Sequence, residues 1–245
     1  MQISIIIATY NAAKTLKRCL DSIVPQLTDE CELILVDGVS KDNTNAIIDS
    51  YGDNVSIHIS EQDQGVYDAW NKGIKVSHGN WIMFVGADDM LLPGIISRYI
   101  QLLENPQLKD YDYISGIDEY VNSKGKLIKE IGSAPAWSKM KKEMVAAHVG
   151  SLHNKRLFSS FGLFDLHFKI CADYELLIRK KDKLKYLFVP YHIAKMAAGG
   201  ISCSNQAVKE AFLIRRKNHS VNSIMNIYIL IRGMCSLIIL KSKLK

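Results

Sequence analysis

The sequence is poor in the residues that mark disulfide-rich, zinc-binding and exported proteins. It has five cysteines among 245 residues, and none of them forms a CxxC pair. They are Cys19, Cys31, Cys171, Cys203 and Cys235. An odd and scattered set indicates neither a disulfide framework nor a zinc site, so we expect a reducing, cytoplasmic environment. The opening residues, MQISIIIATYN, lack the basic segment and the long apolar segment of an export signal, and we expect none.

Other absences exclude some classes of function. The chain has no internal repeat, no low-complexity segment and no linker rich in proline or glycine. Its 31 basic and 25 acidic residues give a modest net charge of +6, and the lysines are dispersed. Because aromatic and basic residues are not interleaved and no known module is visible, we expect no nucleic-acid partner. The positive excess suits an anionic nucleotide or a membrane surface.

What the sequence does contain is an alternation of apolar strands and helices. Hydrophobic residues make up 48% of the chain, which is enough for a substantial core. Segments 3–10, 31–38, 55–60 and 81–89 are apolar runs that end in polar residues, with helical patterns between them. One helix is predicted over 66–79, closed by Gly79. This order predicts an α/β fold in which a mostly parallel sheet is flanked by helices, with the ligand crevice at the carboxyl ends of the strands.

Polar residues occupy those strand ends, in segments 9–11, 37–44 and 86–89. The first turn contains no glycine, so the GxGxxG phosphate grip of dinucleotide folds is absent. A divalent cation can hold a diphosphate instead, because Mn²⁺ and Mg²⁺ take oxygen ligands and need few from the protein. This explains the adjacent carboxylates at the end of the fourth strand. We predict Asp89 as the metal ligand and Asp88 as a contact of the nucleotide.

Four segments carry a family resemblance: SIIIATYNAAKTLKRCLDSI, LILVDGVSKDNT, SEQDQGVYDAWNKGIKVSHGNWIMFVGADD and CADYELLIR. Over roughly the first 200 residues they resemble, in order, the motifs of family 2 glycosyltransferases with the GT-A fold. The resemblance implies an inverting transfer of a sugar from a nucleoside diphosphate sugar, usually UDP-linked, to an acceptor hydroxyl. It also implies that Thr9, Tyr10, Asn11 and Asp37 line the nucleotide pocket, with Asp37 facing the base. Ala87 stands at the first position of the DxD pattern, which leaves the cation with few protein ligands.

The motif EQDQGVYDAWNKG adds a third group of candidates. If residues 66–75 are helical, Asp68 and Lys72 are four positions apart and Asn71 lies beside them. We predict that Asp68, Asn71 and Lys72 contact the diphosphate sugar. The alternative for Asp68 and Lys72 is an exposed ion pair on a solvated helix face.

Inverting transfer requires a carboxylate that deprotonates the acceptor hydroxyl. Asp173 precedes a helical pattern at about the N-cap position, so capping is one explanation of it. By resemblance, the acidic residue of this motif is the general base, and we predict Asp173 in preference to Glu175. His148 is a candidate for substrate binding and His192 for the metal, whereas a structural role is predicted for His153.

The C-terminal part has a pattern of its own. We predict a catalytic domain over 1–205 and a helical appendage over 206–245. Residues 224–240 are nearly all apolar but fall short of the roughly 20 residues that a spanning helix needs. On a helix, one arc holds Asn222, Asn226, Arg232, Gly233, Ser236 and Lys243. The wide apolar face and the closing KSKLK predict peripheral contact of 222–245 with the inner face of the cell membrane; packing on the catalytic domain or on a second subunit is the alternative.

Together these features predict a metal-dependent hexosyl- or N-acetylhexosaminyltransferase. Its acceptor would be a glycan, lipid-linked, in the synthesis of a cell-surface polysaccharide. The alternative is a catalytically silent subunit that binds a nucleotide sugar within a glycan-assembly complex. Residues 199–202 resemble a loop that folds over the donor, with an ordinary turn as the other explanation. A homo-oligomer is left open.

Overall fold

The computed structural model describes residues 1–134, 136–200 and 202–244, with side chains described up to residue 238. The strands are β1 (Ile3–Thr9), β2 (Cys31–Asp37), β3 (Ile57–Ser60), β4 (Trp81–Gly86), β5 (Met90–Leu91), β6 (Tyr113–Val121), β7 (Leu127–Ile131), β8 (Leu152–Asn154) and β9 (Tyr186–Ala197). The helices are α1 (Leu16–Ile23), α2 (Thr44–Asp49), α3 (Val66–Val76), α4 (Ile95–Leu103), α5 (Trp137–Met140), α6 (Lys155–Phe161), α7 (Ala172–Ile178), α8 (Asn205–Lys217) and α9 (Ser223–Leu244).

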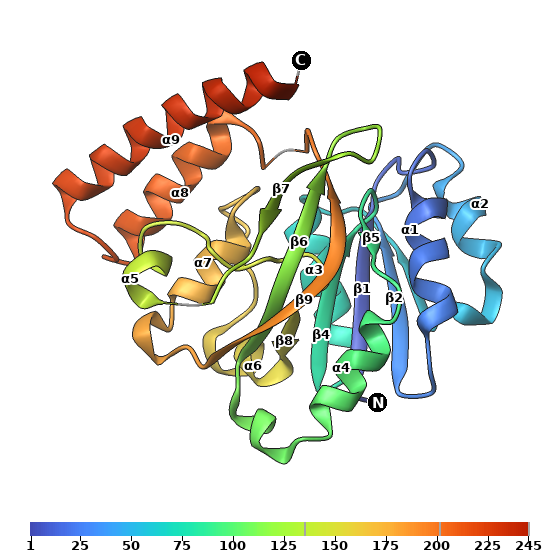
Figure 1. The fold of residues 1–245 in the computed structure, drawn as a ribbon. Helices are drawn as coiled ribbons and strands as arrows, with labels where there is room; N and C mark the ends of the chain where they lie inside the picture. Colours follow the sequence, from blue (N-terminus) through green and yellow to red (C-terminus); the bar gives the residue numbers. More distant parts are fainter. Residues whose placement is uncertain (135, 201, 245) are drawn as a thin grey trace.

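The strands form one central sheet with helices on both faces (Figure 1). Its order is β3-β2-β1-β4-β8-β6-β9-β5, and β7 pairs with β6 at the side. The first four strands in this order are parallel to one another, as the alternating sequence pattern predicts. From β8 onward the sheet is mixed, because β8 is antiparallel to both β4 and β6 and β5 is antiparallel to β9. The fold is thus α/β as predicted, and the parallel arrangement belongs to its amino-terminal half.

Hydrophobic side chains of β1 alternate between two cores, because successive residues of a strand point to opposite faces of the sheet. Ile5 and Ile7 pack with the α1 side chain Leu20 on one face. Ile6 packs with Trp70 of α3 on the other face. Since β1 is covered on both sides, it is apolar almost throughout, which is typical of a central strand in a parallel sheet.

Helix α3 ends at Val76, three residues earlier than predicted. Ser77 has an extended backbone, and Gly79 does not cap the helix. A Cβ atom on Gly79 would lie 2.6 Å from the main-chain nitrogen of Ser4. The prediction that Gly79 closes the helix was therefore wrong, because this glycine lets the chain pass close to β1 before β4 begins.

Helices α8 and α9 pack against each other, and α8 also contacts α7. Figure 1 shows α9 on the outer side of α8, at the edge of the molecule. Among the described residues, no helix has both the length and the apolar character needed to cross a membrane.

Candidate functional site

The register of the parallel strands aligns the polar strand ends that the sequence singles out. Thr9 at the end of β1 lies opposite Asp37 at the end of β2, and Ala8 lies opposite Gly86 at the end of β4. Asp37 in turn pairs with Ser60 at the end of β3. Because these strands run in the same direction, the loops that follow them all begin at one edge of the sheet. The predicted meeting of these segments is confirmed.

Asp37 is the centre of a buried hydrogen-bond network at this edge. Its carboxylate accepts hydrogen bonds from the Thr9 hydroxyl (2.9 Å), the Ser40 amide (2.8 Å), the Asn45 side chain (3.3 Å) and the Ser60 hydroxyl (3.2 Å). Burial by itself raises the pKa of Asp37, but the hydrogen bonds from Ser40 and Thr9 outweigh it and hold the pKa below its usual value. Both Thr9 and Asp37 are buried, so in this conformation they fix the loop after β2 and their side chains do not line an open pocket.

Two loops at this edge are held in a strained conformation. Asn11 and Val39 both have positive φ angles, of 49° and 62°, which is unfavourable for a β-branched residue such as Val39. The Asn11 amide donates to the Ser40 hydroxyl (2.8 Å), and the Asn11 side chain accepts from the Lys41 amide (2.9 Å). Backbone strain of this kind costs about 1–3 kcal/mol and persists where the surroundings enforce it, often at ligand sites.

Tyr10 and Asp63 flank the loop after β2 at Gly38. The Tyr10 side chain is 64% exposed, so its ring is available to a ligand. A Cβ atom on Gly38 would lie 2.5 Å from a carboxylate oxygen of Asp63 and 3.3 Å from the Tyr10 ring. Sequence reasoning missed Asp63, although it lies in the EQDQG motif, because only the contact between the loops after β2 and β3 places it here.

The adjacent carboxylates at the end of β4 have different surroundings. Asp88 is exposed, and its carbonyl oxygen accepts a hydrogen bond from Arg18 (2.9 Å). Asp89 is buried, and its carboxylate accepts a hydrogen bond from the Ala197 amide at the end of β9 (2.9 Å). Burial and the neighbouring charge of Asp88 raise the pKa of Asp89 to about 7. Two crowded carboxylates of this kind are stabilised in their ionised form by a cation.

These residues fit a divalent cation with few protein ligands. Asp88 and Asp89 provide hard oxygen atoms of the type that Mn²⁺ and Mg²⁺ prefer. In the described part of the chain, no three or more His, Cys, Asp or Glu side chains cluster so as to hold a metal by themselves. A cation here would therefore depend on the diphosphate and water for its remaining ligands.

A second buried acid that the sequence reasoning missed lies close to Asp89. Asp118 of β6 is 1% exposed, and its pKa is raised well above the usual value by burial and by the charge of Asp89. The main-chain amides of Val149 and His148 lower the pKa of Asp118, but by less than burial raises it. The available signal was a single acid among the inward-facing residues of YISGIDEYV, but only the sheet order shows that β6 reaches this edge.

Helix α3 carries the third group of candidates. Lys72 lies 4.0 Å from Asp68 and 3.1 Å from Glu61, and it also donates to the Gln62 carbonyl. The predicted spacing of Asp68 and Lys72 is thus present. Asn71 is different, because it is buried and its side chain donates to the Phe164 carbonyl (3.0 Å) and accepts from the Phe164 amide (3.0 Å).

Asn71 therefore joins α3 to the segment before α7, with both its amide nitrogen and its amide oxygen bonded to Phe164. The prediction that Asn71 contacts the diphosphate sugar is not supported by this position, because Asn71 lies on the buried face of α3.

Asp173 lies in the first turn of α7, as the second residue of the helix after the N-cap Cys171. It is not the N-cap, and its side chain turns toward two other residues. The Tyr67 hydroxyl lies 2.9 Å from the Asp173 carboxylate and 2.7 Å from the carbonyl oxygen of Ile170. The Nδ1 atom of His148 lies 3.9 Å from the other carboxylate oxygen of Asp173.

His148 links this carboxylate to the end of β4. Its ring lies against Trp70 of α3 and Phe84 of β4, with centroids 5.1 and 5.8 Å apart. Neither ring nitrogen of His148 has a hydrogen-bond partner within the described ranges, and burial lowers its pKa despite the nearby charge of Asp173. The imidazole is therefore held neutral beside Asp173, with two buried ring nitrogens that have no hydrogen-bond partner within the described residues.

Glu175 does not compete with Asp173 for a role in this site. It is fully buried and forms ion pairs with Arg179 and with Lys217 (2.9 Å). The first turn of α7 thus contains two carboxylates with different surroundings. Asp173 faces Tyr67 and His148, whereas Glu175 joins α7 to α8 through its ion pair with Lys217.

The segment that leads into α7 is fixed by Glu210 of α8, which sequence reasoning also missed. Glu210 is 3% exposed and accepts hydrogen bonds from the amides of Lys169 (3.1 Å), Ile170 (2.9 Å) and Cys171 (3.1 Å). These three residues immediately precede the helix that carries Asp173. Helix α8, predicted as the start of an appendage, is thus built into the support of this side chain.

The other candidates lie elsewhere or only partly within the described chain. His192 of β9 lies 3.1 Å from Glu119 and 3.7 Å from Glu130, so it belongs to an exposed charge cluster on β6 and β7, and its predicted role at the metal is not supported. His153 is wholly buried against Phe84 and Tyr113, in agreement with a structural role. The predicted donor loop 199–202 includes residue 201, which lies outside the described residues.

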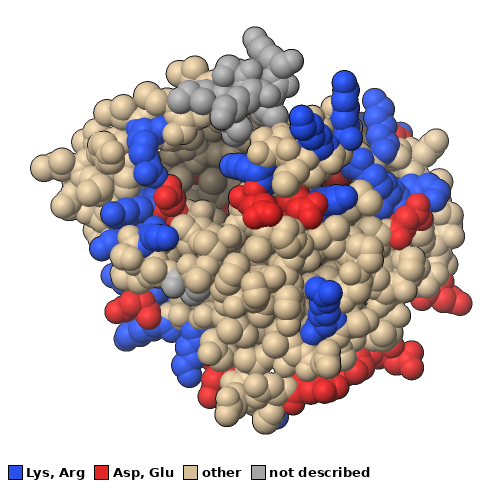
Figure 2. Space-filling view, in the orientation of Figure 1, with Lys and Arg blue, Asp and Glu red and all other residues tan. Residues whose placement is uncertain are grey.

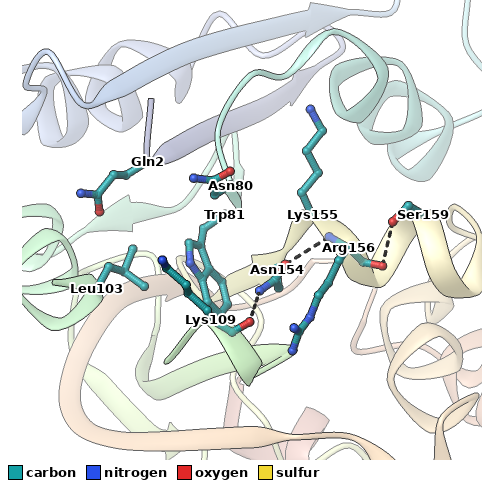
Figure 3. A pocket seen from close by; sticks show the side chains of 9 residues that line it. All are labelled: Gln2, Asn80, Trp81, Leu103, Lys109, Asn154, Lys155, Arg156 and Ser159. Atoms are coloured by element: carbon teal, nitrogen blue, oxygen red, sulfur yellow. Dashed lines mark hydrogen bonds between the residues drawn. The ribbon is translucent and has the colours of Figure 1, made fainter. Parts of the chain in front are cut away.

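A surface pocket of about 690 Å³ lies at the opposite end of the strands, beside the start of β1 and β4 (Figure 3). Trp81 and Asn154 line it together with three basic side chains. Asn154 donates to the Lys109 carbonyl and accepts from the Arg156 amide, as the dashed lines in Figure 3 show. The Arg156 guanidinium lies 3.6 Å from Asp112 and 3.8 Å from Asp110, so its charge is already matched. None of the predicted site residues lies there.

The fold resembles solved structures of glycosyltransferases. The structure of S. aureus TarS residues 1–349 in complex with UDP matches with a TM-score of 0.66 at 16% sequence identity, covering 96% of this chain and 71% of that one. The mannosyltransferase PcManGT from Pyrobaculum calidifontis, in complex with GDP-Man and Mn²⁺, also matches with a TM-score of 0.66, at 15% identity, covering 96% and 69% of the two chains. At this level of identity the likeness shows the fold.

Relatives in sequence carry the same general designation. The PGL/p-HBAD biosynthesis glycosyltransferase of Mycobacterium bovis (strain BCG / Pasteur 1173P2) is 33% identical over 181 residues, which cover 72% of this chain and 68% of that protein. An uncharacterized glycosyltransferase of Rickettsia typhi is 30% identical over 184 residues, covering 71% and 57%. The model of the family described as "Glycosyl transferase family 2" matches residues 4–153. The chain therefore belongs to glycosyl transferase family 2.

Proposed function

We propose that this glycosyltransferase moves a sugar from a nucleoside diphosphate sugar, with UDP as the carrier, to a hydroxyl of a glycan acceptor, with inversion at the anomeric carbon. One observation carries the proposal. The Asp173 carboxylate contacts Tyr67 and lies beside His148, whose ring packs on Phe84 of the strand that ends at the Asp88 and Asp89 pair. These contacts connect the candidate base, through His148, to the strand that ends at the candidate diphosphate site.

The donor would lie across the strand ends. Tyr10 and Asp63, which both lie close to Gly38, would contact the base, while Asn11 and Asp37 would hold the two loops in shape. Lys72, paired with Asp68, provides positive charge for the diphosphate from α3. A Mn²⁺ or Mg²⁺ ion held by Asp89, with Asp88 nearby, would neutralise the diphosphate and stabilise it as a leaving group.

The residues of the chain then account for the transfer step. Asp173 accepts the proton of the acceptor hydroxyl while that oxygen forms a bond to the anomeric carbon. The bond from this carbon to the diphosphate oxygen breaks, and its electron pair leaves with the nucleoside diphosphate. Attack on the face opposite the leaving group inverts the configuration. Tyr67 orients the carboxylate, and neutral His148 can hydrogen-bond to the acceptor or the sugar.

We further propose that the acceptor is lipid-linked and that the product belongs to a cell-surface polysaccharide. The name of the mycobacterial relative, PGL/p-HBAD biosynthesis glycosyltransferase, and the UDP complex of TarS support a surface glycan and a UDP-linked donor. The GDP-Man complex of PcManGT makes GDP-sugars the first alternative donors to test. A chain that binds the donor without turnover would keep the β1, β2 and β4 loops but would have no use for the contact between Asp173 and Tyr67.

Calorimetric titration with UDP, with and without Mn²⁺, tests the donor and metal parts of the proposal. We expect Mn²⁺ to tighten UDP binding at least about tenfold, and Asp89→Asn to remove that gain, because the variant loses the anionic ligand. Asp21→Asn is the matched control, since Asp21 is exposed and pairs with Lys17 on α1. UDP binding that does not change when Mn²⁺ is added would contradict the metal site. Binding of GDP but not of UDP would contradict UDP as the carrier of the sugar.

Turnover measured with a donor found in this way tests the base. Asp173→Asn keeps the shape of the side chain but cannot accept a proton, so we expect kcat to fall by about 10²–10⁴ while UDP binding stays within about twofold. Glu175→Gln, in the same turn of α7, serves as a comparison that should act through stability. A variant at Asp173 with unchanged kcat would refute the proposed role, and a wild-type protein that binds donors but never turns over would favour the silent subunit.

A further inference from the structure

Helix α9 carries apolar side chains on the face that points away from the protein, where a surface helix of a soluble domain is usually polar. Its outward face carries apolar side chains, with Ile224 84% exposed and Ile238 71% exposed. Ile227, Tyr228 and Ile231, also exposed, continue the same stripe at helical spacing. We call these five residues the outer stripe. Isolated exposed apolar residues are common, but five along one helix face are not.

The inner face of α9 includes one buried polar side chain, Asn226. Asn226 is 4% exposed, accepts a hydrogen bond from the buried Arg215 of α8 (2.7 Å) and donates to the Phe212 carbonyl (3.1 Å). A Cβ atom on Gly233 would lie 3.1 Å from Val208 of α8, so this position is also at the helix interface. The arc of polar residues in the sequence therefore packs partly against α8, and the apolar face lies away from it.

The inner side of α9 packs against the rest of the protein. Ile229 and Leu237 are buried there, and Arg232 forms an ion pair with Glu143 at the flank. In Figure 1 the helix forms the outer edge of the molecule, and Figure 2 shows both uncharged surface and Lys or Arg side chains at this edge. Nothing in the described chain covers the outer stripe.

Positive charge is concentrated in the same part of the chain. Residues 205–245 contain eight Lys or Arg and one acidic residue, a net charge of +7, whereas the other 204 residues contain 23 basic and 24 acidic residues, a net charge of −1. The whole positive excess of the protein thus lies in the two C-terminal helices. Residues 241–245, KSKLK, contribute three of these basic residues.

We propose that the outer stripe of α9 docks the protein onto an anionic lipid bilayer, with the helix lying in the plane of the interface. Ile side chains and the amphipathic ring of Tyr228 would enter the boundary between headgroups and acyl chains, and the basic residues would meet anionic headgroups. A second copy of the chain is a poorer occupant, because pairing two α9 helices would bring together two segments that each contain three basic residues, Arg232, Lys241 and Lys243, and no acidic one.

Docking through α9 would link the membrane surface to the proposed site through helix α8. Helix α8 packs against α9 and holds the segment before Asp173 through Glu210. An acceptor confined to the bilayer would then meet an enzyme confined to the same surface. The docking itself does not depend on the proposed transfer reaction, since binding to a bilayer needs neither donor nor metal.

Co-sedimentation with vesicles tests the docking. The full chain should bind vesicles of phosphatidylcholine that contain one third phosphatidylglycerol, and bind vesicles of phosphatidylcholine alone at least about tenfold more weakly. The triple variant Ile227→Ser, Tyr228→Ser, Ile231→Ser should weaken binding to the anionic vesicles at least about tenfold, because each lost CH₂ group reduces the partition. Leu127→Ser on β7, a similarly exposed apolar residue far from α9 in sequence, should leave binding unchanged.

Three results would overturn the proposal. They are failure of the wild-type protein to bind anionic vesicles, binding that the triple variant leaves unchanged, and a dimer that the triple variant dissociates without any effect on vesicles. Light scattering measured on the same samples detects the dimer. Thermal melting checks that the variants fold, and Ile231→Ser alone, at a position 57% exposed, replaces the triple variant if the latter unfolds.

Discussion

Glu210 connects the C-terminal helices to the proposed catalytic residue, and its replacement should affect both stability and turnover. Its two carboxylate oxygens accept three main-chain hydrogen bonds from residues 169–171. In Glu210→Gln, the amide oxygen can keep at most two of these bonds, and the NH₂ group then faces the remaining N–H donor. One buried donor is left without a partner and the charge that strengthens the others is lost.

The magnitude follows from the bonds removed. A hydrogen bond to a charged group contributes about 1.5–3 kcal/mol, so Glu210→Gln should lower the free energy of unfolding by about 2 kcal/mol. Glu210→Ala removes all three bonds and leaves a cavity, and should lower it by about 4 kcal/mol. Because residues 169–171 lead directly into the turn that holds Asp173, we also expect kcat to fall about tenfold in the Gln variant, measured where the variant is fully folded.

Urea unfolding followed by circular dichroism measures the stability, and steady-state turnover measures the catalytic effect. Lys209→Gln is the matched control, since Lys209 is an exposed neighbour on α8 and should change the free energy of unfolding by less than about 0.5 kcal/mol. If Glu210→Gln were as stable as Lys209→Gln, the three hydrogen bonds would not contribute as argued. If it were destabilised but turned over at the wild-type rate, the link between α8 and Asp173 would be refuted.

Further predictions concern the close approach at β4, one ion pair and the orientation of the proposed base. Gly79→Ala places a Cβ atom 2.6 Å from a main-chain nitrogen of β1 and should lower the free energy of unfolding by about 2–4 kcal/mol, against about 1 kcal/mol for Gly52→Ala in open space, as measured by urea unfolding. Burial raises the pKa of Asp165, but the hydrogen bond from Lys217 outweighs it and holds the pKa below its usual value, so the pair stabilises the fold at neutral pH. Asp165→Asn should then cost about 1 kcal/mol at pH 7, and the difference from wild type should shrink as the pH falls below about 4; an equal difference at both pH values would contradict this. Tyr67→Phe should reduce kcat about tenfold with the donor KM unchanged, and a changed KM with unchanged kcat would show that Tyr67 binds the donor instead.

The sequence predicted the polar edge of the sheet well because the information there is local. Apolar runs ending in polar residues fix where β1, β2 and β4 stop, and the parallel pairing of covered strands then aligns Thr9, Asp37 and Gly86 at one edge. The spacing of Asp68 and Lys72 was predictable for the same reason, since a helix places residues four positions apart on one face.

The predictions that failed depended on which side of an element is buried. Asn71 is next to Lys72 in sequence, yet its side chain is on the buried face of α3 and bonds to Phe164. Asp37 ends β2 as expected, but its carboxylate is enclosed by hydroxyls that arrive from other strands and loops. Asp118 was not foreseen because β8, which comes later in the chain, lies between β4 and β6 in the sheet.

The sequence by itself determined the α/β fold, the family and the residues that follow each parallel strand, since these depend on hydrophobic periodicity and on short motifs. Only the tertiary structure decided what each polar side chain faces. In the tertiary structure Asp173 faces Tyr67 and His148, and Glu175 forms an ion pair with Lys217. Glu210 holds residues 169–171, which lead into α7. The tertiary structure also turned the apolar face of α9 outward, because the partner of a helix face is fixed by packing between segments distant in the chain, which periodicity along one segment does not specify.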